Sequence, residues 1–131
     1  MRITVVGLGY VGSVVAGCLA KQGHNVIGVD VERSKVDRLN AGRAPIVEPD
    51  IDVIVAEAVA AGRLSAVSSA AEAVEKSDVA LICVGTPGRA NGDIDLTYIR
   101  RVCEEIGSSL HSPSGAPLIV VRSTVLPGTT R

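Results

Sequence analysis

Residues 6–13 read VGLGYVGS and contain three closely spaced glycines. This stretch follows a short β-branched run, ITVV at 3–6, which predicts a strand. It opens a segment whose apolar residues recur at helical spacing up to Gly23, a residue type that often ends helices. The pattern G-x-G-x-x-G is weak alone, because glycine is common in this chain. Placed between a strand and a helix, it indicates a dinucleotide-binding loop.

Each glycine of this loop has its own expected role. Gly7 permits the tight turn, Gly9 lets a pyrophosphate approach the backbone, and Gly12 allows the helix to pack closely on the strand. The N–H groups at the start of the helix then face the phosphates. Tyr10 is unusual inside such a loop, and its simplest role is to cover it.

Asp30, at the end of the second predicted strand, indicates which dinucleotide binds. A carboxylate at this position accepts hydrogen bonds from the ribose hydroxyls and repels a 2′-phosphate. Arg33 and Lys35 lie close in sequence and favour the phosphorylated cofactor instead. We expect the acid to outweigh them, so NAD is predicted rather than NADP. A second role for Asp30, as a cap of the following helix, is compatible with this.

Apolar runs alternate with helical patterns along the whole chain, which predicts parallel strands joined by right-handed crossovers. Strands are expected at 3–6, 25–30, 63–67, 79–84 and 118–121, and helices at 11–22, 31–40, 51–61, 70–76 and 96–110. The predicted fold is therefore α/β, a doubly wound, Rossmann-like parallel sheet in the order 3-2-1-4-5. Ligands of such sheets bind at the carboxyl ends of the strands, beside the switch point between strands 1 and 4.

Two threonines follow strands that end at this carboxyl edge of the sheet. Thr86 comes just after the fourth strand and can reach a cofactor from the wall opposite the glycines, although an ordinary turn threonine fits equally well. Arg122-Ser123-Thr124 ends the fifth strand and again places hydroxyls at the carboxyl edge. We assign no role to His24 or His111.

Composition excludes several classes of function. The chain is 47% hydrophobic and 21% charged with a net charge of -1, and its basic residues are scattered, so nucleic acid is not an expected partner. No apolar run reaches the ~20 residues of a membrane span and no signal peptide is evident, so a cytoplasmic protein is expected. Cys18, Cys83 and Cys103 have no metal-ligand spacing, and we expect three buried, reduced thiols and no metal site.

Five stretches together resemble the UDP-glucose/GDP-mannose dehydrogenase family, and they span nearly the whole chain: residues 1–30, PIVEP, AGRLS, ICVGTP and RSTVLPGT. The resemblance implies oxidation of a nucleotide sugar at C6, from alcohol to carboxylate, by a homodimer that uses two NAD and a cysteine nucleophile forming a thioester. PIVEP, ICVGTP and RSTVLPGT are most similar to members that act on GDP-mannose, and UDP-glucose remains the alternative. The family's NAD contacts match Tyr10, Val11, Asp30, Lys35, Thr86 and Thr124. Thr124 also lies where the family brings an auxiliary hydroxyl towards the reacting centre.

Some family features are replaced or absent in this stretch. Asp50 stands where the family usually has glycine, and Val67-Ser68-Ser69 replaces its usual Thr-Thr-Asp. The cysteine nucleophile, its assisting lysine, the linking helix and the sugar-nucleotide domain follow this region in the family, and no cysteine here matches that motif. We therefore expect 1–131 to be a truncated NAD-binding domain without its last strand, inactive alone, with apolar surface exposed where that strand packs. A stand-alone nucleotide-binding module is the alternative.

Overall fold

Short β-branched runs form the strands of this protein, because strands buried on both faces need apolar side chains at almost every position. The computed structural model describes residues 1–110 and 115–131, so the predicted loop at 111–117 is only partly covered and His111 lies outside. The strands are β1 (Arg2–Val6), β2 (Asn25–Val29), β3 (Leu64–Val67), β4 (Val79–Ile82) and β5 (Leu118–Val121). They pair in parallel in the order β3-β2-β1-β4-β5, which confirms the predicted fold class and strand order.

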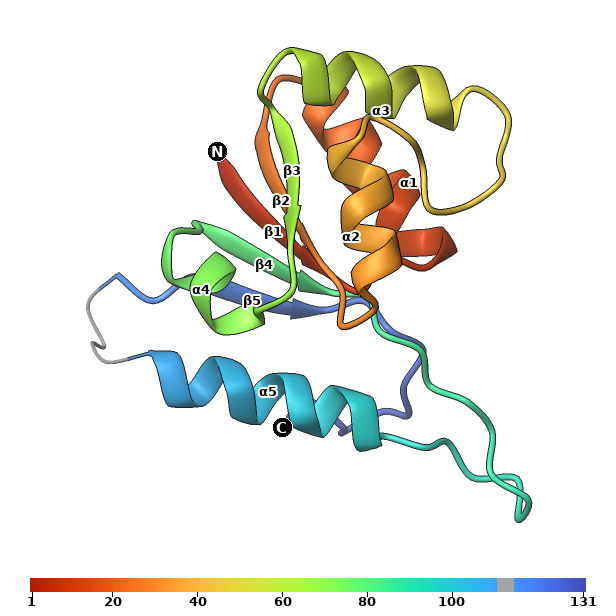
Figure 1. The fold of residues 1–131 in the computed structure, drawn as a ribbon. Coiled ribbons are helices and arrows are strands. Elements are labelled where there is room, and N and C mark those ends of the chain that lie inside the picture. The colour runs from red at the N-terminus through yellow and green to blue at the C-terminus, as the bar shows by residue number, and fades with distance from the viewer. Residues whose placement is uncertain (111–114) are drawn as a thin grey trace.

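Helices cover both faces of this sheet, and each face has its own core (Figure 1). The helices are α1 (Tyr10–Lys21), α2 (Arg33–Asn40), α3 (Ile51–Ala60), α4 (Ala70–Glu75) and α5 (Thr97–Ser109). One core lies between the sheet and α1–α3, and the other lies between the sheet and α4 and α5. None of the helices in the described ranges is long and apolar enough to cross a membrane.

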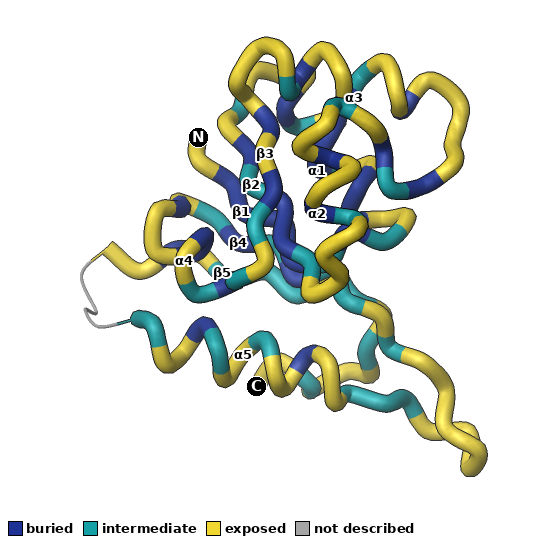
Figure 2. Tube along the Cα trace, in the orientation of Figure 1, coloured by how far each residue is buried: buried dark blue, intermediate teal, exposed yellow. Residues whose placement is uncertain are grey.

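Helix α1 packs closely on its neighbours through small residues. Its buried residues are all small: Gly12, Ser13, Ala16, Gly17 and Ala20. Small residues let α1 lie close to α3, and a Cβ on Gly17 would come within 3.1 Å of Ile51 Cδ1. Two of the larger residues, Val15 and Leu19, are partly buried and pack against this core, whereas Val14 faces outward and is 36% exposed. Buried and exposed residues alternate in this way along the helices (Figure 2).

The expectation of three buried thiols is wrong for two of them. Cys18 on α1 and Cys103 on α5 are exposed, and only Cys83 is partly buried. Cys18 lies on the outward face of α1 for the reason just given: the buried face is selected by size rather than by hydrophobicity. The structure gives no comparable packing reason at Cys103.

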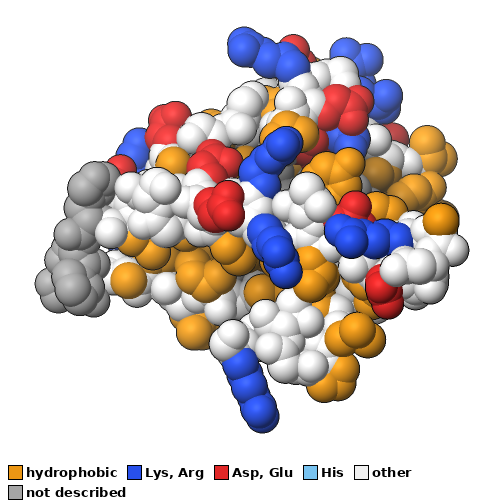
Figure 3. Space-filling model, turned by 90° about the horizontal axis from the view of Figure 1, so that it is seen from below, with side chains coloured by type: hydrophobic (Ala, Val, Ile, Leu, Met, Phe, Trp, Pro, Cys, Tyr) orange, Lys and Arg blue, Asp and Glu red, His pale blue; other side chains and the backbone are white. Residues whose placement is uncertain are grey.

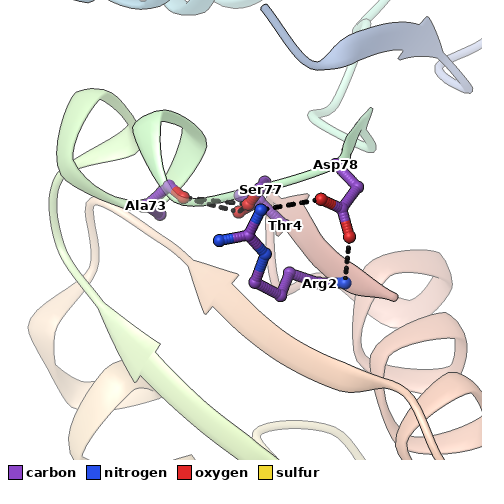
Figure 4. A network of polar contacts seen from close by, with 5 residues as sticks. All are labelled: Arg2, Thr4, Ala73, Ser77 and Asp78. Carbon is purple, nitrogen blue, oxygen red and sulfur yellow. Dashed lines mark hydrogen bonds and ion pairs between the residues drawn. The ribbon is translucent and has the colours of Figure 1, made fainter. Parts of the chain in front are cut away.

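A buried polar network ties α4 to β1 at the amino-terminal edge of the sheet (Figure 4). Thr4 Oγ1 and Ser77 Oγ lie 2.5 Å apart, and both lie within hydrogen-bond distance of the Ala73 carbonyl, at 3.1 Å and 2.9 Å. Beside it, the Asp78 carboxylate accepts from the Arg2 backbone N–H and guanidinium, both at 2.8 Å. Every buried hydroxyl of the network thus has a partner, which satisfies the main condition for polar groups in a core.

The outer edge of β3 is closed by a side chain. Arg63 and Val67 bond to β2 through their carbonyls, so the alternate residue Ala66 turns its backbone groups away from β2. The Asn40 side-chain amide bonds to both backbone groups of Ala66. Its Oδ1 accepts from the Ala66 N–H at 2.8 Å, and its Nδ2 donates to the Ala66 carbonyl at 2.9 Å. Asn40 therefore occupies the position that a further strand would need.

The opposite edge of the sheet is formed by β5 and is more open. None of its four residues is fully buried, and Leu118 is 64% exposed. Leu126, beyond the strand, is 61% exposed. Hydrophobic side chains also reach the surface among the polar ones when the molecule is seen from below (Figure 3). Apolar side chains are thus exposed at the start of β5 and at Leu126 beyond it. That a further strand packs against this edge stays a prediction.

Asp50 has a backbone conformation that explains why glycine suits this position. Its φ is 63°, in the left-handed region, and it is the only non-glycine residue with positive φ in the described chain. Asp is among the few residue types that tolerate this region. It precedes α3 as its N-cap but makes no capping hydrogen bond through its side chain. The departure from glycine changes a side chain and leaves the turn itself in place.

Candidate cofactor site

The carboxyl ends of β1, β2, β4 and β5 bring the predicted site residues to one edge of the sheet. The glycine loop, residues 7–12, follows β1, and Asp30 follows β2. Thr86 and Thr124 follow β4 and β5 on the other side of the switch point. The site thus has a glycine wall and a threonine wall, as parallel doubly wound sheets arrange them.

Two glycines of the loop are required by close packing. Gly7 has φ +100°, and a Cβ there would lie 2.8 Å from the Cys83 carbonyl oxygen. A Cβ on Gly12 would lie only 1.7 Å from the carbonyl oxygen of Gly7. Neither position accepts a side chain without moving backbone, so the roles predicted for these two residues agree with the geometry.

Gly9 is free of packing and open to a ligand. Nothing lies within 4 Å of the position that its Cβ would take. Gly9 is also the N-cap of α1, and the Gly9 carbonyl accepts from the Ser13 N–H at 2.9 Å. The backbone N–H groups of Tyr10, Val11 and Gly12 have no acceptor among the described residues. Unpaired N–H groups at a helix start, beside open space, are suited to binding an anion such as a phosphate group.

Ser13 holds the loop in this shape and is a residue that motif reasoning missed. Its side chain is buried, and its Oγ donates to the Leu8 carbonyl at 3.1 Å. The only signal in the sequence is a small polar residue in the first turn of a helix, which many helices carry for other reasons.

Asp30 is fixed between the loop and the chain that follows β2. Its Oδ2 accepts from the Leu8 N–H at 2.8 Å, and its Oδ1 accepts from the Glu32 N–H at 2.9 Å. Its side chain is 11% exposed. Helix α2 has Glu32 as its N-cap, so Asp30 supports the turn before the helix rather than capping the helix itself.

Lys35 lies among carboxylates rather than facing an open phosphate site. Its Nζ is 3.1 Å from Glu32 Oε2 and 3.8 Å from Asp30 Oδ2. The hydrogen bond with Glu32 and the nearby charge of Asp30 raise the pKa of Lys35 despite some burial. The Arg33 side chain is exposed, and its Nε lies 3.9 Å from Asp37 Oδ1. Two acids around one lysine leave local negative charge, which disfavours a 2′-phosphate.

Tyr10 and Val11 form the outer surface of the loop. Tyr10 is 58% exposed and Val11 is 46% exposed. The Tyr10 hydroxyl donates to the Val47 carbonyl at 3.3 Å, so it contacts the PIVEP segment as well as covering the loop. Both side chains thus leave apolar surface exposed at the start of α1.

In the threonine wall, hydroxyl hydrogen bonds join the segment after β4 to the segment after β5. Thr86 Oγ1 donates to the Thr124 carbonyl at 2.8 Å. Ser123, which the sequence places at this edge without a defined role, donates from Oγ to the Val84 carbonyl at 2.6 Å. Hydrogen bonds between residues about forty positions apart leave no pattern in the sequence, so these pairings were not predictable.

Cys83 lies beneath the glycine loop and is poorly suited to be a nucleophile. Burial raises the pKa of its thiol, and the nearby Arg122 offsets this only in part. A thiolate is the reactive form of cysteine, so a raised pKa lowers reactivity. No group of three or more His, Cys, Asp or Glu side chains within 1–110 and 115–131 is arranged to hold a metal ion.

Comparisons with known proteins show the family to which this chain is similar. The whole chain, residues 1–131, matches the model of the UDP-glucose/GDP-mannose dehydrogenase family, NAD binding domain. It is 53% identical to GDP-mannose 6-dehydrogenase of Pseudomonas putida over 131 residues and 43% identical to UDP-glucose 6-dehydrogenase of Rhizobium meliloti over 130. The match to the first relative covers 100% of this chain and 30% of the relative's length. The match to the second covers 98% of this chain and 29% of the relative's length.

The solved structures give the same result. A ternary complex of GDP-mannose dehydrogenase from Pseudomonas aeruginosa superposes with a TM-score of 0.96 at 53% identity, over 99% of this chain and 30% of that one. A UDP-glucose dehydrogenase from Pyrobaculum islandicum gives 0.90 at 43% identity, over 98% and 30%. The chain thus spans less than a third of the length of these relatives.

Proposed function

The chain belongs to the UDP-glucose/GDP-mannose dehydrogenase family, and we propose that it is the NAD-binding part of a nucleotide-sugar 6-dehydrogenase acting on GDP-mannose. Greater identity to GDP-mannose 6-dehydrogenases than to UDP-glucose 6-dehydrogenases, 53% against 43%, supports this choice of sugar nucleotide. NAD is the cofactor of the domain. The sugar-oxidising reaction is a proposal about the whole protein, of which this chain is one portion.

The observation that carries the proposal is the open backbone at Gly9 beside the unpaired N–H groups of α1. We propose that these N–H groups hold the pyrophosphate and that Asp30 accepts from the hydroxyls of the adenine ribose. Lys35 orients and partly neutralises Asp30, and Tyr10 and Val11 flank the pyrophosphate. Thr86 and Thr124 contact the nicotinamide half from the opposite wall, with Thr124 nearest the reacting centre.

The proposed overall reaction converts the C6 alcohol to a carboxylate with loss of four electrons and uptake of one water. NAD, when bound, accepts one hydride in each of the two oxidation steps. The covalent thioester step needs a cysteine thiolate, and the described part of this chain offers no suitable one. Cys83 is covered by the glycine loop, while Cys18 and Cys103 lie along helices. We therefore expect residues 1–131 alone to bind NAD without oxidising sugar.

Calorimetric titration of the 131-residue chain with NAD and with NADP tests the cofactor assignment. We expect NAD to bind more tightly, and failure of NAD to bind would remove the basis of the proposal. Reduction of NAD by the isolated chain with GDP-mannose would contradict its proposed inactivity.

The substrate is tested with a protein that carries this chain together with the remainder of its reading frame. We expect NAD reduction with GDP-mannose and little with UDP-glucose, at two NAD per sugar. The reverse preference would assign the chain to a UDP-glucose 6-dehydrogenase. Sedimentation of the same protein checks the proposed homodimer.

A further inference from the structure

Two hydroxyl hydrogen bonds join the ends of β4 and β5, and we call them the hydroxyl clasp. One runs from Thr86 Oγ1 to the Thr124 carbonyl at 2.8 Å. The other runs from Ser123 Oγ to the Val84 carbonyl at 2.6 Å, and the same Oγ lies 3.4 Å from the carbonyl of Ile82. The bonds run in opposite directions between the two segments, so each segment is held at two points.

The clasp commits the protons of its two hydroxyls and leaves a third hydroxyl free. A hydroxyl has one proton to donate, so Thr86 and Ser123 can offer a ligand only their lone pairs. The Thr124 hydroxyl, in contrast, has no hydrogen-bond partner in the described part of the chain. Thr124 is exposed, and it remains able to donate as well as to accept.

The clasp also connects Thr124 to the glycine loop through backbone. The Cys83 N–H donates to the Val6 carbonyl at 2.7 Å, immediately before the loop. The carbonyl of Cys83 and the backbone N of Val84 lie 2.8 Å and 3.0 Å from where a Gly7 Cβ would be. Ser123 bonds to the next group along this segment, the Val84 carbonyl. The position of Thr124 relative to the loop is therefore set through contacts that include Ser123.

We propose that Ser123 is a positioning residue for NAD binding, which acts by holding Thr124 at a fixed distance from the glycine loop. The cofactor spans both walls, so a fixed separation lowers the cost of forming contacts on both at once. This inference rests on the proposed function, because it assumes that Thr124 contacts the cofactor. It assigns to Ser123 no contact of its own with the cofactor.

A double-mutant cycle on NADH affinity tests the proposal, with Kd measured by calorimetry for the wild type, Ser123→Ala, Thr124→Val and the double variant. We expect Ser123→Ala to weaken binding by roughly three- to tenfold, the range for loss of one neutral hydrogen bond. In the Thr124→Val background the same change should have almost no further effect, because the contact it positions is already gone.

Ser108→Ala is the matched control, since Ser108 Oγ also donates to a backbone carbonyl, that of Glu104 at 2.8 Å, within helix α5. It should leave Kd unchanged.

The outcomes separate this inference from the proposed function. If wild-type chain does not bind NADH, the proposed function fails. If wild type binds and Ser123→Ala binds equally well, or loses affinity by the same factor with and without Thr124→Val, the positioning role is wrong and the function stands. Thermal melting of each variant ensures that Kd is measured on folded protein. If Ser123→Ala does not fold, Ser123→Cys, with its weak S–H donor, replaces it in the cycle.

Discussion

Replacing Gly9 by alanine should separate cofactor binding from folding, because the methyl group would meet ligand rather than protein. Nothing lies within 4 Å of the added Cβ, and the backbone at Gly9 is extended, with φ -77° and ψ -164°. Any residue can adopt this conformation. Alanine reduces the entropy of the unfolded chain, a gain of about 0.4–1 kcal/mol, but it is a poorer N-cap than glycine by a similar amount. The two terms nearly cancel, so the free energy of unfolding should change by less than about 1 kcal/mol.

The affinity for NADH should change much more than the free energy of unfolding. An N–H···O hydrogen bond to a phosphate needs a donor–acceptor distance of about 2.9 Å, whereas a methyl carbon keeps other heavy atoms about 3.5–4.0 Å away. Displacing the pyrophosphate weakens at least one charge-assisted hydrogen bond, each of which contributes about 1.5–3 kcal/mol. At about 1.4 kcal/mol per factor of ten, NADH affinity should fall by roughly ten- to a hundredfold.

Gly12→Ala is the matched comparison, because its Cβ would lie 1.7 Å from the Gly7 carbonyl oxygen. No rotation of a side chain relieves an overlap between Cβ and backbone, so we expect a loss of about 3 kcal/mol or more in the free energy of unfolding. Urea unfolding gives the stabilities, and calorimetric titration with NADH gives the affinities. Gly9→Ala binding NADH as tightly as wild type, or unfolding as readily as Gly12→Ala, would refute the reasoning.

Three further predictions concern single side chains: Asn40 and Asp30, described above, and Asp95, whose Oδ1 accepts from the Thr97 N–H at 2.9 Å and from the Thr97 hydroxyl at 2.6 Å. Asn40→Ala should lower the free energy of unfolding in urea by about 1–3 kcal/mol, because it leaves the partly buried Ala66 N–H and carbonyl unpaired; a change under about 0.3 kcal/mol would contradict this. Asp30→Asn should weaken NAD binding roughly tenfold or more and lower the ratio of NAD affinity to NADP affinity, because the charge that repels a 2′-phosphate is gone. Calorimetry with both cofactors measures the two affinities, and an unchanged ratio would count against this prediction. The hydrogen bonds from Thr97 lower the pKa of Asp95 from 3.8 to about 2, with a further contribution from a nearby arginine. The folded pKa is depressed, so these bonds are complete above about pH 4 and are lost only as pH falls through about 2. The chemical shift of the Thr97 amide proton, followed by NMR as the pH is lowered, should change with a midpoint near pH 2 rather than near pH 4.

The sheet could be predicted because its signals are local. Each strand is a short β-branched run bounded by glycine, proline or polar residues, and the observed bounds lie within two residues of the predicted ones. The order followed from the alternation of strands and helices, since right-handed crossovers leave few ways to arrange five parallel strands. The glycine wall was also local: Gly7, Gly9 and Gly12 lie within six residues, and Asp30 ends the next strand.

Packing and long-range hydrogen bonds could not be read in the same way. Helical spacing correctly placed α1, but Val14 and Cys18 face solvent because close approach to α3 selects the small residues. Hydrophobicity alone therefore did not identify the fully buried residues of α1. The bonds of Ser123 and of Asn40 link segments 39 and 26 residues apart, and they depend on how strand ends and helix ends meet in three dimensions. The residue types at these positions are common in turns and carry no signal of their partners.

The closure of the β3 edge by Asn40 bears on how the sheet is assembled during synthesis. The strands β1, β2 and β3 are neighbours in space, and Asn40 and Ala66 both precede β4 in the chain. A ribosome delivers the amino-terminal residues first. When residue 67 has left the exit tunnel, every element needed to seal that side is available. The nascent sheet then has one edge still open, that of β1, and strands made later can be added only there. The growth of the sheet is thus given a direction before its second half has been translated.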